Sequence, residues 1–159
     1  MSSVIRANRE VRRCALQAMY QFDVVAAADH AIVKSTLEES PGTADDHARG
    51  FDLATLAWEF RNEADTALRP FATEWPTHRQ PVIDRNLLRL AYYEIVYGEV
   101  PAKVAINEAV ELAKEFGSEK SGAFVNALLD RLWTQLGRSG ADSGESSAHD
   151  SPSTNPEGS

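Results

Sequence analysis

The stretch that decides the fold is PAKVAINEAVELAKEFGSEKSGAFVNALLD, residues 101–130. Pro101 suits a first helical turn, where its missing N–H leaves no bond unmade. The apolar face of the helix that follows is formed by Ile106, Ala109, Val110, Ala113 and Phe116. Gly117 provides a C-terminal stop, and Ser118 can cap a second helix. The buried face of this second helix is formed by Val125, Leu128, Leu129, Leu132 and Leu136.

The remainder of the chain shows the same helical pattern between three short breaks. The breaks lie at 40–47, 74–81 and 98–101, and each contains proline, which ends or restarts a helix. The expected helices span 5–28, 30–39, 46–71, 82–97, 102–116 and 119–136. No strand pattern of useful length and no internal repeat is visible. We therefore predict an all-α fold, a compact helical bundle with short connections.

Composition sets further bounds on the class of protein. The 159 residues suffice for one domain with a real core, and the single Cys14 excludes an intramolecular disulfide and a cysteine-built metal site. No apolar run of about 18 residues occurs, so we expect no membrane span and a reduced, cytoplasmic setting. From Gly137 onward apolar bulk is nearly absent. This predicts a folded domain over 1–137 and a disordered, acidic tail rich in serine, glycine and proline over 138–159.

Charge is distributed unevenly along a chain whose formal net charge is −8. Residues 1–13 hold four arginines and one glutamate, whereas 138–159 hold one arginine and four acidic residues. A local basic face can bind phosphate on an acidic protein. At about 100° per residue, the first helix places Val11, Ala15, Ala18 and Phe22 on its core face. The opposite face carries Arg6, Arg9, Arg12 and Arg13, and continues with Leu16 and Tyr20.

This arginine face suits a nucleic acid, because guanidinium groups bind phosphates and an exposed Tyr20 can stack on an unpaired base. The alternative is a basic face that only solvates its helix. A second strip lies off the buried face of the last helix and carries Lys120, Phe124, Ala127 and Arg131. Phe124 either stacks on a base or joins a protein interface, or it lies against a neighbouring helix at the edge of the core.

The helix at 102–116 carries Glu108, Glu111 and Glu115 on its outer face. These carboxylates are either simply solvated or form a docking surface for a basic protein partner. Motifs for catalysis are not apparent, since the four histidines have no metal-ligand spacing and no nucleotide-binding loop, HExxH or GxSxG motif occurs. We therefore expect no enzymatic activity, no cofactor and no metal site.

Three segments resemble the NusB family of transcription antitermination proteins. NREVRRCALQAMYQFD, residues 8–23, is similar to the family's arginine-rich first helix, and IDRNLLRLAYYEI, residues 83–95, is similar to its central helix. Residues 101–130 resemble the most diagnostic stretch of the family, with the words VAINEAVELAK and FVN intact. The resemblance covers residues 4–136, and only the predicted tail lies outside it.

The resemblance implies an all-α fold of two packed helical subdomains. It also implies binding of the single-stranded boxA element of ribosomal RNA leader transcripts together with ribosomal protein NusE, within the antitermination complex on RNA polymerase. A similar domain occurs at the N-terminus of a ribosomal RNA cytosine methyltransferase, so the alternative is a related protein- or RNA-binding domain without the catalytic part. That enzyme needs a cofactor-binding α/β domain downstream, and we expect none after 138–159. Whether the chain is a monomer or a homodimer stays open.

The residue pattern and the resemblance together give the candidate site residues, of which Lys120 comes from the strip on the last helix alone. The candidates for RNA binding are Arg6, Arg9, Arg12, Arg13, Lys120 and Phe124. The candidates for partner binding are Tyr20, Asp84 and Phe124. Arg9 and Arg12 match the positions of the family's arginine motif, whereas Arg6 and Arg13 are added by proximity. Asn8 and Glu10 stand at positions where the motif is more often basic.

Overall fold

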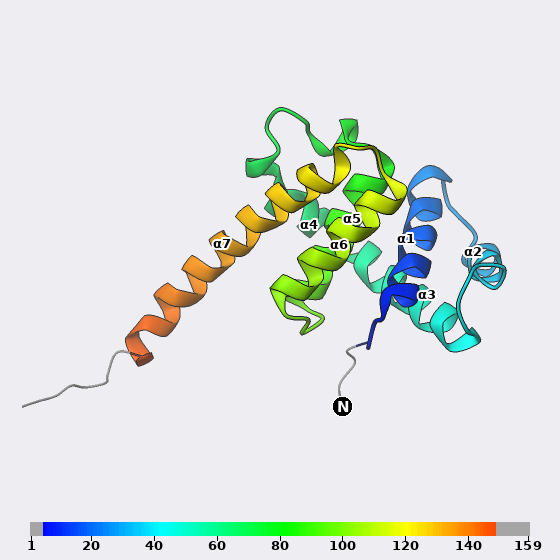
Figure 1. Ribbon diagram of the computed structural model, residues 1–159, viewed down its shortest axis with the longest axis horizontal. Helices are drawn as coiled ribbons and strands as arrows, with labels where there is room; N and C mark the ends of the chain where they lie inside the picture. The colour runs from blue at the N-terminus through cyan, green and yellow to red at the C-terminus, as the bar shows by residue number, and fades with distance from the viewer. Residues whose placement is uncertain (1–4, 149–159) are drawn as a thin grey trace, which may run out of the picture.

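The structure, a computed structural model, describes residues 5–148, with side chains described as far as residue 137. The helices are α1 (Arg9–Val24), α2 (His30–Leu37), α3 (Ala44–Glu59), α4 (Arg61–Leu68), α5 (Val82–Val96), α6 (Ala102–Phe116) and α7 (Ser121–Ala148) (Figure 1). Two single 3-10 turns, η1 (Arg69–Phe71) and η2 (Thr77–Arg79), lie between α4 and α5. Over the described residues no strand occurs, and the predicted all-α class is confirmed.

Some helix boundaries follow the sequence pattern and others differ from it. Pro81 and Pro101 precede α5 and α6 as expected. The first helix begins only at Arg9, because Asn8 adopts an extended conformation and caps it. The expected helix over 46–71 is broken at Phe60, which separates α3 from α4. The Phe60 ring stacks on Tyr97 with ring centroids 4.3 Å apart, so a tertiary contact accompanies the break.

The core divides into two clusters that share α5. One cluster joins α4, α5, α6 and α7, and α5 contributes Leu87, Leu88, Ala91 and Tyr92 to it. The other joins α1, α2 and α3 to the opposite side of α5, through Leu90 and Tyr93. This arrangement agrees with two packed subdomains, and it explains why nearly every residue in the middle of α5 is buried. In Figure 1, α5 lies between the α1–α3 group and α7.

An ion-pair network fixes α1 against α5. Arg85 donates two hydrogen bonds of 2.7 Å to the Asp23 carboxylate, and Asn86 donates a third of 2.9 Å. Arg89 bridges onward, with a bond of 3.2 Å to Asp23 and a bidentate pair at 2.9 and 2.8 Å to Asp65 of α4. The network therefore ties both subdomains together at the C-terminal end of α1.

The junction between α6 and α7 depends on a glycine for reasons of space. Gly117 caps α6 with an N–H···O bond of 2.8 Å to Ala113 and has φ −97°, which any residue adopts. A Cβ atom there would lie 2.4 Å from the Ser121 Oγ. Ser118 accepts a hydrogen bond from the Lys120 N–H, as expected of a cap. The sequence thus located the stop correctly, although close approach rather than a left-handed conformation requires the glycine.

Helix α7 extends beyond its expected end at 136. Its backbone is helical to Ala148, within the segment 138–159 for which we predicted a disordered tail, and 149–159 lie outside the described residues. A helix already nucleated by packed turns needs no new nucleus to continue, which offsets the poor helix propensity of this segment. The C-terminal part of α7 projects away from the bundle in Figure 1, and Leu136, expected to be buried, is exposed.

Candidate nucleic-acid and partner interface

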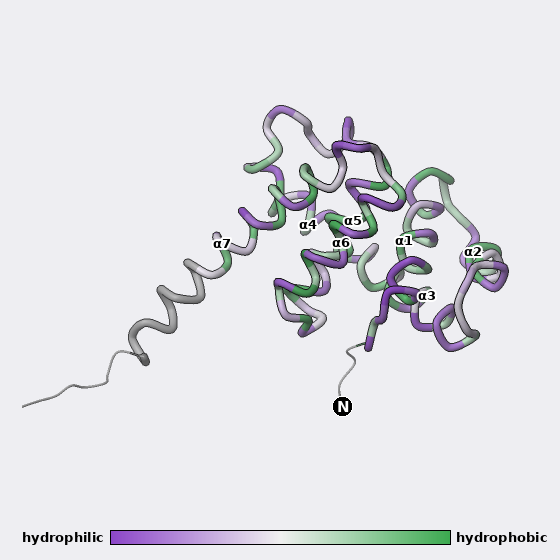
Figure 2. Tube along the Cα trace, viewed as in Figure 1, coloured by the Kyte–Doolittle hydropathy of each residue, from purple (hydrophilic) through white to green (hydrophobic). Residues whose placement is uncertain are grey.

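The start of α1 is set by Asn8, one of the two residues that depart from the family's basic pattern. Its Oδ1 accepts a hydrogen bond of 2.8 Å from the Val11 N–H, and its Nδ2 donates to Asp46 of α3 at 3.2 Å. Asn8 therefore fixes where α1 begins and ties that end to α3. The first turns of α1 are hydrophilic, as Figure 2 shows. An arginine here would supply a charge but would lose the cap.

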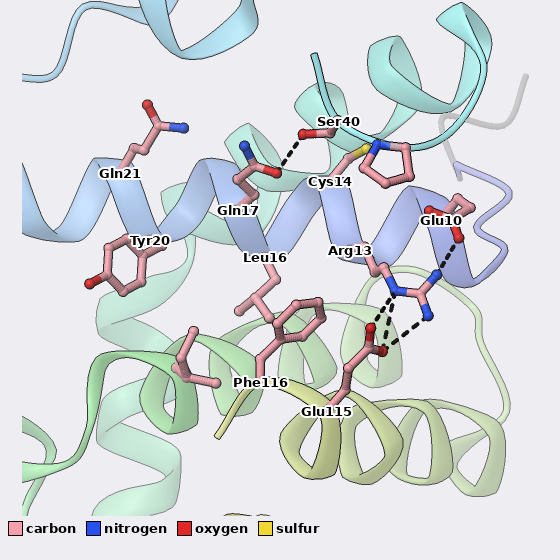
Figure 3. Close-up of a pocket in the computed structure, with 12 residues that line it drawn as sticks. Glu10, Arg13, Cys14, Leu16, Gln17, Tyr20, Gln21, Ser40, Glu115 and Phe116 are labelled. Atoms are coloured by element: carbon pink, nitrogen blue, oxygen red, sulfur yellow. Dashed lines mark hydrogen bonds and ion pairs between the residues drawn. The ribbon is translucent and has the colours of Figure 1, made fainter. Parts of the chain in front are cut away.

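Two of the predicted arginines reach carboxylates of α6. Arg9 forms a bidentate pair with Glu108, with Nε and one Nη at 2.7 and 2.9 Å from the two carboxylate oxygens. One helical turn further, Arg13 donates to Glu115 at 3.0 and 3.3 Å and also pairs with Glu10 on its own helix. Figure 3 shows Arg13 pointing across the gap between α1 and α6. The arginine face is therefore partly neutralised within the chain.

The two readings left open for the α6 glutamates both need revision. Glu108 and Glu115 turn toward α1, whereas Glu111 pairs with Lys114 on its own helix at 3.5 Å. The hydrogen bonds from Arg9 hold the pKa of the Glu108 carboxyl below its ordinary value. Glu108 and Glu115 therefore neither point freely into solvent nor remain open to a basic partner, because each pairs with an arginine of α1.

Arg12 does not lie on the exposed face, and this part of the prediction is wrong. Its guanidinium forms a bidentate pair with Glu94 of α5 at 3.0 and 2.9 Å and donates to the Ala7 carbonyl at 3.0 Å. The two side chains are only 6% and 3% exposed. Burial raises the pKa of the Glu94 carboxyl, and the guanidinium opposes that shift. Arg12 is thus committed to the packing of α1 on α5, and its side chain is too buried to lie on the exposed arginine face.

The remaining residues of the arginine face separate in the same way. Arg6 lies before the helix and is exposed, and only its backbone carbonyl is engaged, by Arg49 at 3.2 Å. Leu16, expected to be exposed, is 3% exposed because it packs into the cluster formed by α4 to α7. Tyr20 is 42% exposed, as predicted. The face is therefore narrower than the helical projection suggested.

Tyr20 and Arg13 line one groove of about 750 Å³ between α1, the 40–41 loop and the C-terminal end of α6 (Figure 3). Its floor is mostly apolar, and Phe116, expected to be buried, is 46% exposed there. The lining comprises Glu10, Arg13, Cys14, Leu16, Gln17, Tyr20, Gln21, Ser40, Pro41, Ile83, Glu115 and Phe116. Burial raises the pKa of the Cys14 thiol to about 11, so that group stays protonated at neutral pH. The groove combines an apolar surface with a charged rim at one end.

Asp84 is not on the surface, so it cannot contact a partner directly as predicted. The side chain is completely buried in the first turn of α5, and its carboxylate oxygens have no hydrogen-bond partner among the described residues. Burial raises the pKa of the Asp84 carboxyl, and the nearby Ser121 hydroxyl offsets this only in part, without forming a well-aligned bond. Because Asp84 lies in the first turn of α5, the helix dipole still stabilises its negative charge.

The predicted strip on α7 is only partly a free surface. Phe124 is half-buried and meets Trp75 edge to face, with ring centroids 4.9 Å apart. These two rings, Ala127 and Arg131 line a second groove of about 500 Å³ between α7 and the 71–75 segment. Lys120 is exposed, lines neither groove and pairs with no acidic group within residues 5–137. Phe124 thus packs against Trp75 of the 71–75 segment and also lines the groove, and its role in RNA or partner binding stays a prediction.

The structure brings Arg13 and Tyr20 together, and Phe124 and Arg131 together, but it shows no contact between the two groups. Trp75 was missed by the sequence reasoning, as was the pairing of Glu108 and Glu115 with α1. One signal for the α1–α6 pairing was available, because α1 repeats arginines and α6 repeats glutamates at intervals of about one helical turn. Nothing local in a sequence states which helices lie side by side.

Within the part of the chain whose side chains are described, no cluster of three or more histidine, cysteine, aspartate or glutamate side chains could hold a metal ion. Among residues 5–148, none of the helices combines the length and the hydropathy that crossing a bilayer requires.

Comparison with known proteins shows what this chain is similar to. The model of the NusB family matches residues 9–133. The transcription antitermination protein NusB of Anaeromyxobacter sp. (strain Fw109-5) is 44% identical over 124 residues, covering 76% of this chain and 85% of that protein. Its counterpart in Dehalococcoides mccartyi (strain CBDB1) is 40% identical over 127 residues, covering 79% and 89%.

Solved structures give the same result for the fold. NusB of T. maritima matches with a TM-score of 0.69 and 31% identity, covering 80% of this chain and 91% of that one. A structure described as the antitermination factors NusB and NusE in complex with dsRNA matches with a TM-score of 0.69, covering 80% and 96%. Its identity of 22% supports similarity of fold alone.

Proposed function

Because this chain belongs to the NusB family of transcription antitermination proteins, which are not enzymes, we propose that it binds the single-stranded boxA element of ribosomal RNA leader transcripts. It does so together with ribosomal protein NusE, as part of the antitermination complex on RNA polymerase in the cytoplasm. The consequence is processive transcription of ribosomal RNA. The solved NusB–NusE complex with RNA, which shares this fold, supports both kinds of partner.

The observation that carries the proposal is the apolar groove directly beside the arginine face. Tyr20 and Phe116 expose large apolar surfaces in it, while Arg13 stands at its rim. An apolar groove of this size suits side chains from a protein partner, because burying them releases water from both surfaces. A guanidinium at the edge suits an RNA phosphate. A protein and an RNA can thus lie side by side, with NusE in the groove and RNA along α1.

The RNA contacts divide between phosphates and bases. Arg6, Arg9 and Arg13 supply phosphate contacts, and Arg12 positions α1 by its buried pair instead. On α7, the open side of the Phe124 ring offers a stacking platform for an unpaired base. Lys120 and Arg131 are exposed cations on the same helix and add phosphate contacts.

Affinity for RNA alone is low and rises when NusE is bound. The protein carries a net charge of −8, so long-range attraction to RNA is weak, and Arg9 and Arg13 already have carboxylate partners. A partner in the adjacent groove adds its own contacts to the same strand. By linkage, RNA must then strengthen NusE binding by the same factor.

The test is a titration of single-stranded boxA-like RNA, with and without NusE, over a series of salt concentrations. Replacing Arg9 and Arg13 together by alanine should weaken binding and reduce the salt slope by about 0.7 per lost phosphate contact. Arg69→Ala/Arg79→Ala is the matched control, because it also removes two exposed arginines, one from η1 and one from η2. An unchanged slope in the double variant, or no RNA binding even with NusE, would refute the assignment.

Calorimetry tests the groove separately. Tyr20→Ala should weaken NusE binding, because this side chain is exposed and lines the groove. Ile32→Ala, which truncates an exposed apolar side chain on α2 outside the groove, should leave NusE affinity unchanged. NusE should bind more tightly to the RNA-saturated protein than to the free one. Equal affinities would mean two independent sites.

A further inference from the structure

We propose that Glu108 and Glu115 of α6 are built-in competitors for phosphate, so that the arginine face admits only ligands that offer several linked phosphates at once. The inference rests on the proposed RNA binding and concerns its threshold and selectivity. The two carboxylates lie on a different helix from Arg9 and Arg13, and each occupies donors of one arginine that a phosphate would use.

The geometry of the pairs supports competition rather than mere proximity. Arg9 presents its Nε and one Nη to both oxygens of Glu108, which is the forked arrangement that also binds a phosphate. Arg13 presents its Nε and Nη2 to Glu115. A phosphate can take these donors only after the carboxylate has turned away, because the same N–H groups cannot serve both in full.

The exposure of the pairs decides which arginines can exchange partners. Glu115 is 43% exposed, so it can turn into water at small cost, whereas Glu108 is 18% exposed beside an Arg9 that is 41% exposed, so its release costs more. The Arg12–Glu94 pair has no such option, because a released carboxylate would remain buried and uncompensated. The chain thus holds two exchangeable arginines beside one that is locked.

The balance of charge around the face explains the selectivity. Arg9 and Arg13 are opposed by Glu10, Glu108 and Glu115, so the face offers little net positive field to a lone anion. A single phosphate that displaces one carboxylate gains about as much interaction free energy with the arginine as the departing carboxylate loses. The two arginines lie four residues apart, about 6 Å along the helix. A strand with linked phosphates therefore replaces both carboxylates in one binding event, and the second exchange is intramolecular.

The experiment compares glutamine variants, which keep the shape and one acceptor of the side chain but remove its charge. Glu108→Gln and Glu115→Gln should each tighten binding of the boxA-like RNA by about two- to fivefold, measured with NusE present. Glu111→Gln is the matched control, since it makes the same change of net charge on the same helix but pairs with Lys114. If Glu111→Gln raises RNA affinity as much as the other two variants do, net charge alone explains the effect and the proposal is overturned. Unchanged RNA affinity in all three variants would also overturn it.

A second arm uses inorganic tripolyphosphate and inorganic monophosphate, followed on the Nε–H NMR signals of Arg9 and Arg13. The wild-type protein should bind tripolyphosphate and not monophosphate, and the Glu108→Gln/Glu115→Gln variant should narrow that difference. This arm separates the two hypotheses. If no RNA binds but the glutamine variants still bind tripolyphosphate more tightly than the control, the competition is upheld and the RNA function fails. If RNA binds and the tripolyphosphate affinities do not change, the competition fails alone.

Discussion

Replacing Arg12 by methionine should destabilise the fold severely, although the residue belongs to an arginine-rich helix. Its guanidinium makes three hydrogen bonds of 2.9–3.0 Å, two to Glu94 and one to the Ala7 carbonyl. Methionine retains an apolar stem but leaves the Glu94 charge buried without a partner. Breaking a buried pair in this way costs about 3–5 kcal/mol, which corresponds to a fall in Tm of roughly 10–20 °C for a domain of this size.

The assay is urea unfolding followed by circular dichroism, with Arg9→Met as the matched control. Arg9 undergoes the same chemical change in a solvent-exposed pair, so its variant should unfold almost as the wild type does. The double variant Arg12→Met/Glu94→Leu should recover most of the lost stability, because an apolar pair of similar size removes the buried charge.

The pH dependence provides an independent check. Burial raises the pKa of Glu94 above its unfolded value of about 4.3, and in Arg12→Met nothing opposes that shift. The folded state then holds its proton more tightly, so stability is fully present below the unfolded pKa and is lost as pH rises through the folded pKa. The deficit of the variant should therefore be largest near pH 8 and shrink toward pH 4. A loss no greater than that of Arg9→Met, or a deficit independent of pH, would refute the buried pair.

Three further predictions concern folding. Asp84→Asn should raise Tm near pH 7, because burial raises the pKa of the Asp84 carboxyl and its charged form therefore destabilises the fold. Thermal melts should show this gain vanish as pH falls below about 4, where the carboxyl of the wild type is protonated in the folded and unfolded states. Gly117→Ala should cost about 1–3 kcal/mol in urea unfolding, since its Cβ would lie 2.4 Å from the Ser121 Oγ. Gly137→Ala is the control, because the added Cβ would meet no neighbouring atom within 4 Å, and this variant should be neutral or slightly stabilising. Removal of 138–159 should lower Tm by less than about 5 °C, and a larger fall would show that this segment stabilises the domain.

The sequence by itself determined the helical class and the bounds of two central helices. Periodic apolar residues and the prolines at 81 and 101 located α5 and α6 to within one residue, because proline and helical spacing act through the local backbone. The words within 101–130 indicated the family, which the comparisons confirmed. Tyr20 was correctly expected to be exposed.

Only the tertiary structure decided which charges are available. A helical projection places Arg9, Arg12 and Arg13 on one side of α1, but it does not say how much of that side another helix covers. Helix α5 covers Arg12 and supplies Glu94, which is 82 residues away in sequence, and α6 reaches only the rim. Burial and ion pairing depend on such long-range neighbours, whose positions follow from the packing of both cores. Hence the sequence identified the arginine face, and the fold determined that two of its arginines can exchange partners while a third cannot.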